Sequence, residues 1–395
     1  MSDLNPGFWR IGNDELKHIE ELFCAGFTGS MTGKFEESFA AAFNAKYVIA
    51  VNSGTSALHS AVYALDIGPG DEVIVPPLTF IATAYAPMFV GAVPVFADID
   101  SETFLIDPNE IERKITSKTK AIITVSLYGL SPNMDRIMEI ADKNGLKVIE
   151  DNAQCVYGKY NDQIVGSFGD IAIYSMQRSK HLTSGDGGVV ITNEAKLAER
   201  CRKFCDLGYR TLTAESSSNE SFKQFIQHPD YKRHDIVGYN FRMPEICAAI
   251  GLGQLEKLEM FVNKRITIAN YYQKAVESCK WLKPQLVPDN IIHSYWTYVL
   301  RIDDENTNIT WDDFRDQFVK NGGEPFYGAW SLCYLEPALE GLFFKENNIR
   351  YEKGLCPIAE KIQPNLIQLK TNYEELDYAR QQADILYKTI NNFGV

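Results

Sequence analysis

The sequence is short of positive charge. It has 39 Lys and Arg against 52 Asp and Glu, a net charge of −13 at pH 7. A nucleic-acid-binding protein needs clustered Lys and Arg to neutralise phosphates, so this balance argues against one. No apolar run reaches the roughly 18 residues that suggest a membrane span, and residues 1–15 lack the basic and apolar regions of a signal peptide. We therefore expect a cytoplasmic protein with neither a nucleic-acid nor a membrane partner.

Cysteine and histidine are also sparse. Eight cysteines in 395 residues are too few for a disulfide scaffold. Cys201 and Cys205 lie four residues apart on an expected helix, but no second pair completes a zinc site. The six histidines are scattered, with no helical pair at metal-ligand spacing. We expect free thiols, most of them buried, and no metal site.

The order of strand-like and helix-like segments predicts an α/β fold. Short apolar runs at 47–51, 72–75, 94–97 and 121–125 have the length and composition of buried strands. Helical patterns of about a dozen residues alternate with strands when the strands pair in parallel through right-handed crossovers. The first two thirds of the chain should therefore form a mostly parallel sheet flanked by helices.

The chain is too long for one ordinary core, so a large and a small domain are expected. An amphipathic pattern over 246–276 predicts one long helix of the kind that commonly bridges two domains. After Trp281 the pattern changes to strands mixed with helices. We place the large domain at 1–265 and the small domain at 266–395. The polar stretch within 210–235 is expected to be a surface insertion.

One stretch, 146–193, carries the main chemical signal. A strand-like run ends in Glu150 and Asp151, and Lys180 precedes a glycine-rich turn. Open α/β sheets place ligand-binding groups at the carboxyl ends of strands, and a lysine in such a setting can form a Schiff base. An isolated lysine is more often a solvated surface residue. Together, however, the acid and the lysine suggest pyridoxal phosphate, which needs a lysine for its aldehyde and an acid for its ring nitrogen.

Two further segments fit the same ligand. The strand at 47–51 runs into Asn-Ser-Gly-Thr-Ser at 52–56 and then into a helix, an arrangement that aims backbone N–H groups at a phosphate. The alternative for Thr55 and Ser56 is an ordinary helix cap. Phe80 follows a strand end and two prolines, where its ring either stacks on a flat cofactor or joins the core.

Six segments, in the same order, resemble landmarks of one family. The resemblance is to the sugar aminotransferases of the DegT/DnrJ/EryC1/StrS family, over nearly the whole chain. It implies the fold of type I pyridoxal-phosphate-dependent transferases: a large domain with a mostly parallel seven-stranded sheet flanked by helices, and a smaller α+β C-terminal domain. The segments are NSGTSAL at 52–58, PPLTFIATAYA at 76–86, GAVPVFADID at 91–100, EDNAQ at 150–154, GSFGDIAIYSMQRSKHLTSGDGG at 166–188 and GYNFRMPEICAAIGLGQLEKL at 238–258.

The resemblance implies a role for each residue around the cofactor ring. Lys180 would bind the aldehyde of pyridoxal 5′-phosphate, which becomes pyridoxamine 5′-phosphate during turnover. Asp151 would pair with the pyridine nitrogen. Phe80 would stack on the ring, and Gln154 would lie against the phenolic oxygen or the ring face. Lys180 and Asp151 are thus the expected catalytic residues.

It also implies how the phosphate is held. Gly54, Thr55 and Ser56 at the start of a helix would bind it together with Ser175. Asn240 resembles an asparagine that reaches the same phosphate from the neighbouring subunit. The expected assembly is therefore a homodimer with shared active sites, in which a monomer is inactive.

The reaction type depends on position 180. Sugar dehydratases of this family carry His where the aminotransferases carry Lys, and here Lys180 is followed by His181. Transamination is therefore expected rather than dehydration. Lysine is a good base only when burial near the cofactor lowers its pKa.

The acceptor is the least determined part. We expect a keto-sugar, most suitably a nucleotide-linked 4-keto-6-deoxy sugar, aminated from glutamate or glutamine for surface polysaccharide or natural-product biosynthesis. A keto-inositol (scyllo-inosose) aminotransferase is the first alternative; a pyridoxal-phosphate-dependent sugar dehydratase and a non-catalytic regulator are the others. Aromatic residues of the C-terminal part are as readily core residues as sugar contacts. Candidate substrate contacts are Thr32, His181, Tyr295, Trp296, Tyr327 and Trp330.

Overall fold

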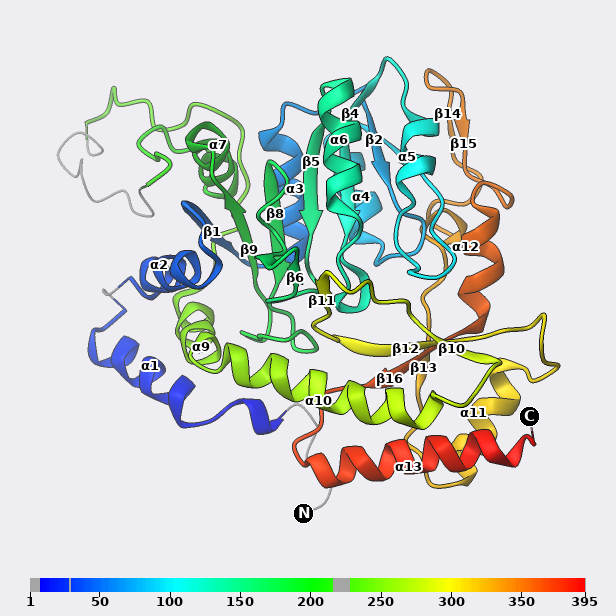
Figure 1. Ribbon diagram of the computed structural model, residues 1–395. Helices are drawn as coiled ribbons and strands as arrows, with labels where there is room; N and C mark the ends of the chain where they lie inside the picture. Colours follow the sequence, from blue (N-terminus) through cyan, green and yellow to red (C-terminus); the bar gives the residue numbers. More distant parts are fainter. Residues whose placement is uncertain (1–7, 28–29, 216–227, 395) are drawn as a thin grey trace.

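A mixed seven-stranded sheet forms the centre of the molecule (Figure 1). The computed structural model describes residues 8–27, 30–215 and 228–394. Strands β3, β2, β4, β5 and β8 are parallel neighbours, and β9 runs antiparallel to both β8 and the edge strand β1. This confirms the predicted mostly parallel sheet. The strands are β1 (Tyr47–Val51), β2 (Glu72–Val75), β3 (Val93–Phe96), β4 (Thr119–Val125), β5 (Lys147–Asp151), β8 (Ile171–Ser175) and β9 (Gly188–Thr192).

Helices cover both faces of this sheet. In Figure 1, α3 and α4 lie behind it and α6 lies in front. The sequence sets the bounds of α6 locally: Asn133 Oδ1 accepts a hydrogen bond from Arg136 N at 3.1 Å, and Gly145 ends the helix at a φ of 65°. The apolar spacing of the sequence predicts a helix over 134–144, which the structure confirms. The flanking helices are α2 (Met31–Phe43), α3 (Gly54–Ala64), α4 (Ala82–Phe89), α5 (Pro108–Lys114), α6 (Met134–Asn144) and α7 (Ala195–Cys205).

The C-terminal part has its own antiparallel sheet, in the order β10-β12-β16-β13. Helices α10, α11 and α13 pack on it around a separate apolar core that includes Trp281, Phe314 and Leu386. This is the α+β arrangement that was predicted. Its elements are α10 (Leu258–Val276), β10 (Leu282–Pro284), β12 (Thr297–Ile302), α11 (Trp311–Lys320), β13 (Tyr327–Gly328), α12 (Pro357–Ile362), β16 (Leu366–Lys370) and α13 (Leu376–Asn392).

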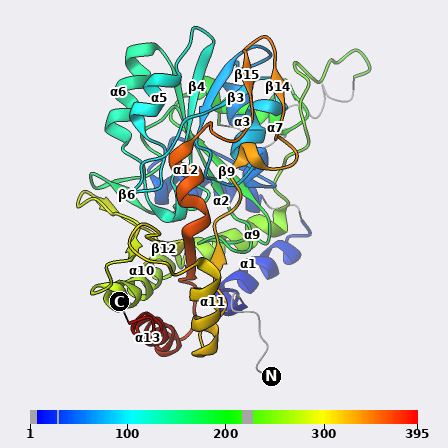
Figure 2. The same ribbon diagram turned by 90° about the vertical axis from the view of Figure 1, so that its right-hand side faces the viewer.

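Smaller elements join the two parts. Strand β6 pairs with β7 on one side and with β11, which lies between β10 and β12 in the chain, on the other, and β14 and β15 form a hairpin. Seen from the side, α10 and α13 run beneath the main sheet (Figure 2). Among the described residues, we find no helix with the length and apolar character needed to span a bilayer. The bounds are α1 (Asn13–Cys24), β6 (Lys159–Tyr160), β7 (Gln163–Ile164), α9 (Glu245–Leu255), β11 (Ile291–Ile292), β14 (Phe343–Phe344) and β15 (Ile349–Arg350).

Three local expectations differ from the structure or fall outside it. The predicted helix 246–276 is two helices, because Lys257 leaves helical geometry (φ −109°, ψ 8°) and α10 starts after it. The sequence at 29–33 predicts a loop, but Ser30 caps α2, which begins at Met31. For the predicted insertion, 216–227 lie outside the described residues. The domain boundary near 265 stays a prediction, since α10 runs through it.

A buried ion pair anchors the edge strand that leads to α3. Arg202 on α7 binds Glu36 on α2 through Nη2 and Oε2 at 2.8 Å, and both side chains are only 9% exposed. Arg202 Nη2 also donates to Val48 O at 2.8 Å, while Glu36 Oε1 accepts from Ala50 N at 2.9 Å. The pair therefore holds β1 between two helices.

Replacing Glu36 by alanine should strongly destabilise the protein, since it leaves the Arg202 charge buried without its carboxylate. We expect a loss of about 3–5 kcal/mol of unfolding free energy, measured by urea denaturation. The control is Arg113→Ala, which breaks the surface pair of Arg113 with Glu110 and should change stability little. Equal, small losses in both variants would contradict this role for Glu36.

Candidate active site

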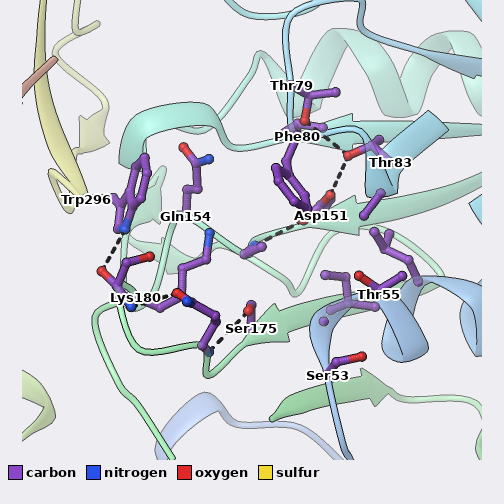
Figure 3. Close-up of a pocket in the computed structure, with 18 of the residues that line it drawn as sticks. Ser53, Thr55, Thr79, Phe80, Thr83, Asp151, Gln154, Ser175, Lys180 and Trp296 are labelled. Atoms are coloured by element: carbon purple, nitrogen blue, oxygen red, sulfur yellow. Dashed lines mark hydrogen bonds between the residues drawn. The ribbon is translucent and has the colours of Figure 1, made fainter. Parts of the chain in front are cut away.

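A cavity of about 340 Å³ lies where the carboxyl ends of β4, β5 and β8 meet the N-terminus of α3 (Figure 3). The segment after β2 forms another wall, and two tryptophans from the C-terminal part complete it. Ligand sites of open α/β sheets lie at this edge. The cavity brings together nine predicted residues: Gly54, Thr55, Phe80, Asp151, Gln154, Ser175, Lys180, Trp296 and Trp330.

Lys180 lies in the loop between β8 and β9 and extends its amine into this cavity (Figure 3). Its Nζ is 4.8 Å from the centre of the Trp296 ring. The indole is fixed in turn, since Trp296 Nε1 donates to Ser179 O at 2.9 Å. Burial lowers the pKa of Lys180 to about 8, although the charge of Asp151 acts in the opposite direction. A much larger fraction of the amine than in a solvated lysine is therefore neutral, and able to act as nucleophile or base, near physiological pH.

Asp151, at the end of β5, is only 4% exposed and faces the same cavity. Its Oδ2 accepts from Thr83 Oγ1 at 2.9 Å and its Oδ1 from Ala153 N at 3.1 Å. Because the Thr83 hydroxyl donates its hydrogen bond to Asp151, the Thr79 hydroxyl must be the donor in its 3.1 Å contact with Thr83. Burial raises the pKa of Asp151, while these hydrogen bonds and the Lys180 charge oppose that rise.

The N-terminus of α3 forms the end of the cavity opposite the tryptophans. Ser53 caps the helix, its Oγ accepting from Ser56 N at 3.1 Å. The positive end of the helix and the hydroxyl groups of Ser53, Thr55 and Ser175 face the cavity (Figure 3). The approach is close: a Cβ on Gly54 would lie 2.9 Å from the Ser175 Cβ. Only glycine at this position lets α3 meet β8.

The glycine-rich turn after Lys180 has a similar steric basis. A Cβ on Gly188 would lie 2.2 Å from Ser53 O, and one on Gly187 would lie 2.5 Å from Ser184 Oγ. The first of these contacts involves backbone, which cannot move aside as a flexible side chain can. The turn therefore packs the Lys180 loop directly against the start of α3, and this packing sets the size of the cavity.

Gln154 completes the side of the cavity next to Lys180 (Figure 3). Its Oε1 accepts from Tyr128 N at 2.8 Å, and its side chain is only 3% exposed. The hydrogen bond fixes the orientation of the amide, because a carbonyl oxygen must face the N–H donor. The NH2 group is then turned away from Tyr128.

Ser56 and His181 differ from their expected positions. Neither is among the residues that line the cavity. Ser56 Oγ donates to Asn52 Oδ1 at 2.7 Å, which occupies its hydroxyl proton. His181 is fully buried, and its Nε2 donates to Ser294 O at 2.9 Å. Burial and the nearby Arg265 charge lower the pKa of His181 well below its usual value, so this neutral ring is a packed interior group out of reach of a substrate.

Four other predicted residues also lie away from the cavity lining. Thr32 Oγ1 donates to Glu245 Oε1 at 2.8 Å. Tyr295 stacks on His293 with ring centres 3.8 Å apart, and Tyr327 is 67% exposed. Asn240 is exposed in the single chain. Thr32 and Tyr295 are positioned by contacts that sequence patterns do not reveal, and the role of Asn240 toward a second copy stays a prediction.

The sequence reading missed several groups at the site. Ser53 could have been found, because it is the second residue of the Asn-Ser-Gly-Thr-Ser segment and lies directly before the expected helix, where a helix cap is usual. Thr79 and Thr83 lie within the landmark at 76–86, but the contact of Thr83 with Asp151 spans 68 residues and has no local signal. Asp186 also lines the cavity, on the turn after Lys180.

This set of residues fits pyridoxal phosphate. Asp151 is a buried carboxylate whose pKa is raised, because its hydrogen bonds do not fully offset the cost of burying its charge. A cationic ring nitrogen would supply the missing positive partner. Lys180 has the lowered pKa that carbonyl chemistry needs, and the start of α3 provides donors for a phosphate. Half-exposed Phe80 adds a flat apolar face. Fold and site together define a pyridoxal-phosphate-dependent aminotransferase of fold type I.

Comparison with known proteins gives the family. The model of the DegT/DnrJ/EryC1/StrS aminotransferase family matches residues 10–383, so the chain belongs to this family of sugar aminotransferases. It is 41% identical to a GDP-perosamine synthase of Escherichia coli O157:H7 over 268 residues, 68% of each chain. It is 34% identical to a pleiotropic regulatory protein of Geobacillus stearothermophilus over 389 residues, 97% of this chain and 95% of that one.

Solved structures agree. The aminotransferase from Psychrobacter cryohalolentis superposes with a TM-score of 0.86 at 31% identity, covering 98% of both chains. The similarity extends through both the main sheet and the C-terminal part, as the coverage requires. The fold predicted from the sequence is thereby confirmed.

Lys180 should titrate apart from the other lysines. In protein stripped of cofactor, acetic anhydride labelling of Lys180 at a series of pH values, read by peptide mass spectrometry, should give a midpoint near pH 8. Exposed Lys143, whose amine pairs with Glu112 at the surface, is the internal control for the labelling reaction. Asp151→Asn removes a charge that raises the Lys180 pKa, so the midpoint should fall further. A midpoint that rises in Asp151→Asn would contradict this electrostatic arrangement.

Proposed function

We propose that this enzyme transfers an amino group from glutamate or glutamine to a keto-sugar, with a nucleotide-linked 4-keto-6-deoxy sugar as the acceptor. The observation that supports this proposal most strongly is that the Lys180 amine, with its pKa lowered to about 8, shares one cavity with buried Asp151. The similarity to a GDP-perosamine synthase supports the choice of sugar. Surface polysaccharide or natural-product biosynthesis would use the amino sugar.

The chain's residues divide the work around the cofactor. Pyridoxal phosphate, when bound, supplies an electron sink for the carbon from which a proton is removed. Lys180 would hold the cofactor's aldehyde and would serve as the base for that proton. Asp151, oriented by Thr83 and Ala153, would keep the ring nitrogen protonated. Gln154 and Phe80 would lie against the ring.

Phosphate binding falls to the start of α3. The free backbone N–H groups of its first turn and the hydroxyls of Thr55 and Ser175 line that end of the cavity. Gly54 permits the approach, and the cap residue Ser53 adds a further hydroxyl. Ser56 contributes through the turn it completes with Ser53 and Asn52 rather than by lining the cavity.

The opposite end of the cavity suits a sugar. The rings of Trp296 and Trp330 are 6.0 Å apart, and Trp330 meets Phe80 at 5.5 Å edge to face. Such an aromatic wall offers flat apolar surface to one face of a sugar ring or to a nucleobase. The two tryptophans come from the C-terminal part, so we propose that the domain division near 265 separates cofactor binding from acceptor binding.

Nitrogen transfer tests the reaction directly. Wild-type protein with amide- or amine-labelled ¹⁵N-glutamine, or ¹⁵N-glutamate, and a panel of keto-sugars should yield a labelled amino sugar by mass spectrometry. Lys180→Arg should lose about 10²–10⁴-fold in rate, since it removes the acid–base group, whereas the exposed Lys143→Arg should not. Full turnover by Lys180→Arg refutes the proposal.

The same experiment separates the alternatives. Preferred labelling of a keto-inositol would identify a scyllo-inosose aminotransferase, and loss of water without nitrogen transfer would identify a dehydratase. Cofactor binding with no turnover of any acceptor would indicate a regulator, a possibility raised by the relative named a pleiotropic regulatory protein.

We also propose a homodimer with shared sites. Several large apolar residues close to Asn240 are exposed in the single chain: Phe89, Leu207, Val237, Tyr239 and Ile246, with Val237 89% exposed. Phe89 and Tyr239 both pack on buried His59, so they belong to one surface. A second copy covering that surface would bury it and bring Asn240 toward the neighbouring phosphate site.

Hybrid dimers test the shared site. Lys180→Arg and Asn240→Asp chains with different affinity tags are co-expressed, and the mixed dimer is purified. If Asn240 serves the neighbouring site, one site of the mixed dimer is wild type, and the dimer should recover about half of wild-type activity. The wild-type/Lys180→Arg hybrid is the control, also at half. No recovery in the mixed dimer would show that Asn240 does not act across the interface.

A further inference from the structure

A buried arginine far from the site in sequence contacts the Lys180 loop. Arg10 lies just before α1, in the short 3-10 helix Phe8–Arg10, yet it is only 2% exposed. Its guanidinium donates to the backbone carbonyl oxygens of Lys180 and Arg178, and Nη1 also reaches His181 O at 3.3 Å. One side chain thus binds three carbonyls of a single loop across about 170 residues of sequence.

These contacts suit arginine alone. The guanidinium is a planar fork with five N–H donors, whereas a lysine amine is a point charge with three donors. Within the described part of the chain, no carboxylate forms an ion pair with Arg10. The loop carbonyls therefore compensate part of the cost of burying this charge, although Arg10 Nε has no partner among the described residues, and they would lose their donors if Arg10 were removed.

The α9–α10 junction holds Arg10 in place. Gln254, fully buried, donates from Nε2 to Arg10 O and to Glu15 Oε1, both at 2.7 Å. Its Oε1 accepts from Thr183 N at 3.2 Å, so the same side chain also binds the far end of the Lys180 loop. Lys257, where the predicted long helix breaks, binds Glu15 Oε1 at 2.6 Å and Arg10 O at 3.1 Å.

Close packing lets the N-terminal segment reach this junction. A Cβ on Gly253 would lie 2.7 Å from Glu15 N, so only glycine allows α1 to approach α9 so closely. The two helices lie side by side at the edge of the molecule (Figure 1). The sequence landmark at 238–258 contributes no residue to the cavity lining. It does contain Gly253, Gln254 and Lys257.

We propose that Arg10 is a positioning residue: by binding the carbonyls of 178, 180 and 181, it fixes the direction in which the Lys180 side chain enters the cavity. Gln254 and Lys257 hold Arg10 for this purpose. The N-terminal segment is therefore part of the catalytic apparatus without touching a ligand. This inference rests on the proposed role of Lys180.

Arg10→Met tests the proposal through two readouts that need no sugar. Amide hydrogen exchange in the full-length protein as purified should become about tenfold faster in residues 177–184. In protein stripped of cofactor, the pH midpoint of Lys180 labelling should rise by about one unit, because a displaced amine is better hydrated. Arg10→Lys, which keeps the charge but not the fork, should give intermediate values.

Two controls separate positioning from stability. Arg113→Met replaces an exposed arginine and should change neither readout. Leu386→Ala, in the core of the C-terminal part, should lower the melting temperature while leaving the exchange of 177–184 and the Lys180 midpoint unchanged. A wild-type midpoint and wild-type exchange in Arg10→Met overturn the proposal; if that variant does not fold, the same wild-type values in Arg10→Lys overturn it.

The outcome is independent of the reaction assignment. Shifts in both readouts together with full turnover by Lys180→Arg would support the Arg10 contacts and refute the proposed function. Wild-type values for Arg10→Met together with inactive Lys180→Arg would refute the Arg10 role and leave the proposed function standing.

Discussion

The burial of one amine opposite one carboxylate governs this structure. Lys180 and Asp151 share a cavity in which dehydration opposes charge on both: burial lowers the pKa of the lysine to about 8 and raises that of the aspartate. Neither group is held by a strong local ion pair, so each is left able to act on a ligand. An exposed lysine would stay protonated and unreactive at neutral pH, and a freely solvated aspartate would exert little control over a ring nitrogen.

Keeping such groups in place requires support from distant parts of the chain. The parallel strands bring Asp151 and Ser175 to one edge of the sheet, and the packing of Gly188 against Ser53 closes the Lys180 turn onto α3. Thr83 orients the aspartate across 68 residues. The buried pair of Glu36 and Arg202 fixes the strand that leads to α3, and the N-terminal segment binds the Lys180 loop from outside the sheet. Contacts throughout the part of the molecule built on the main sheet thus keep the buried Lys180 and Asp151 in place.

Much of this could be read from the sequence, where the signal is local. The strands at 47–51 and 72–75, the helix 134–144 and the pairing of Asp151 with Lys180 in one site follow from apolar runs, caps and residue types at strand ends. Contacts set by tertiary packing could not be read. The sequence does not show that His181, next to the reactive lysine, points into the interior. Nor does it show that the Ser56 hydroxyl donates its hydrogen bond to Asn52. At the break between α9 and α10, the contacts of Lys257 with Arg10 O and Glu15 likewise have no local signal in the sequence.

The most direct measurement of the central claim is borohydride reduction of the protein loaded with pyridoxal phosphate, followed by peptide mapping. Reduction joins the cofactor permanently to the amine that holds it. If Lys180 is that amine, the added mass appears on the peptide that contains residue 180 and on no other, and the protein loses the visible absorbance of the bound cofactor. Cofactor mass on a different lysine, or no adduct at all, would contradict the assignment of this cavity as the active site.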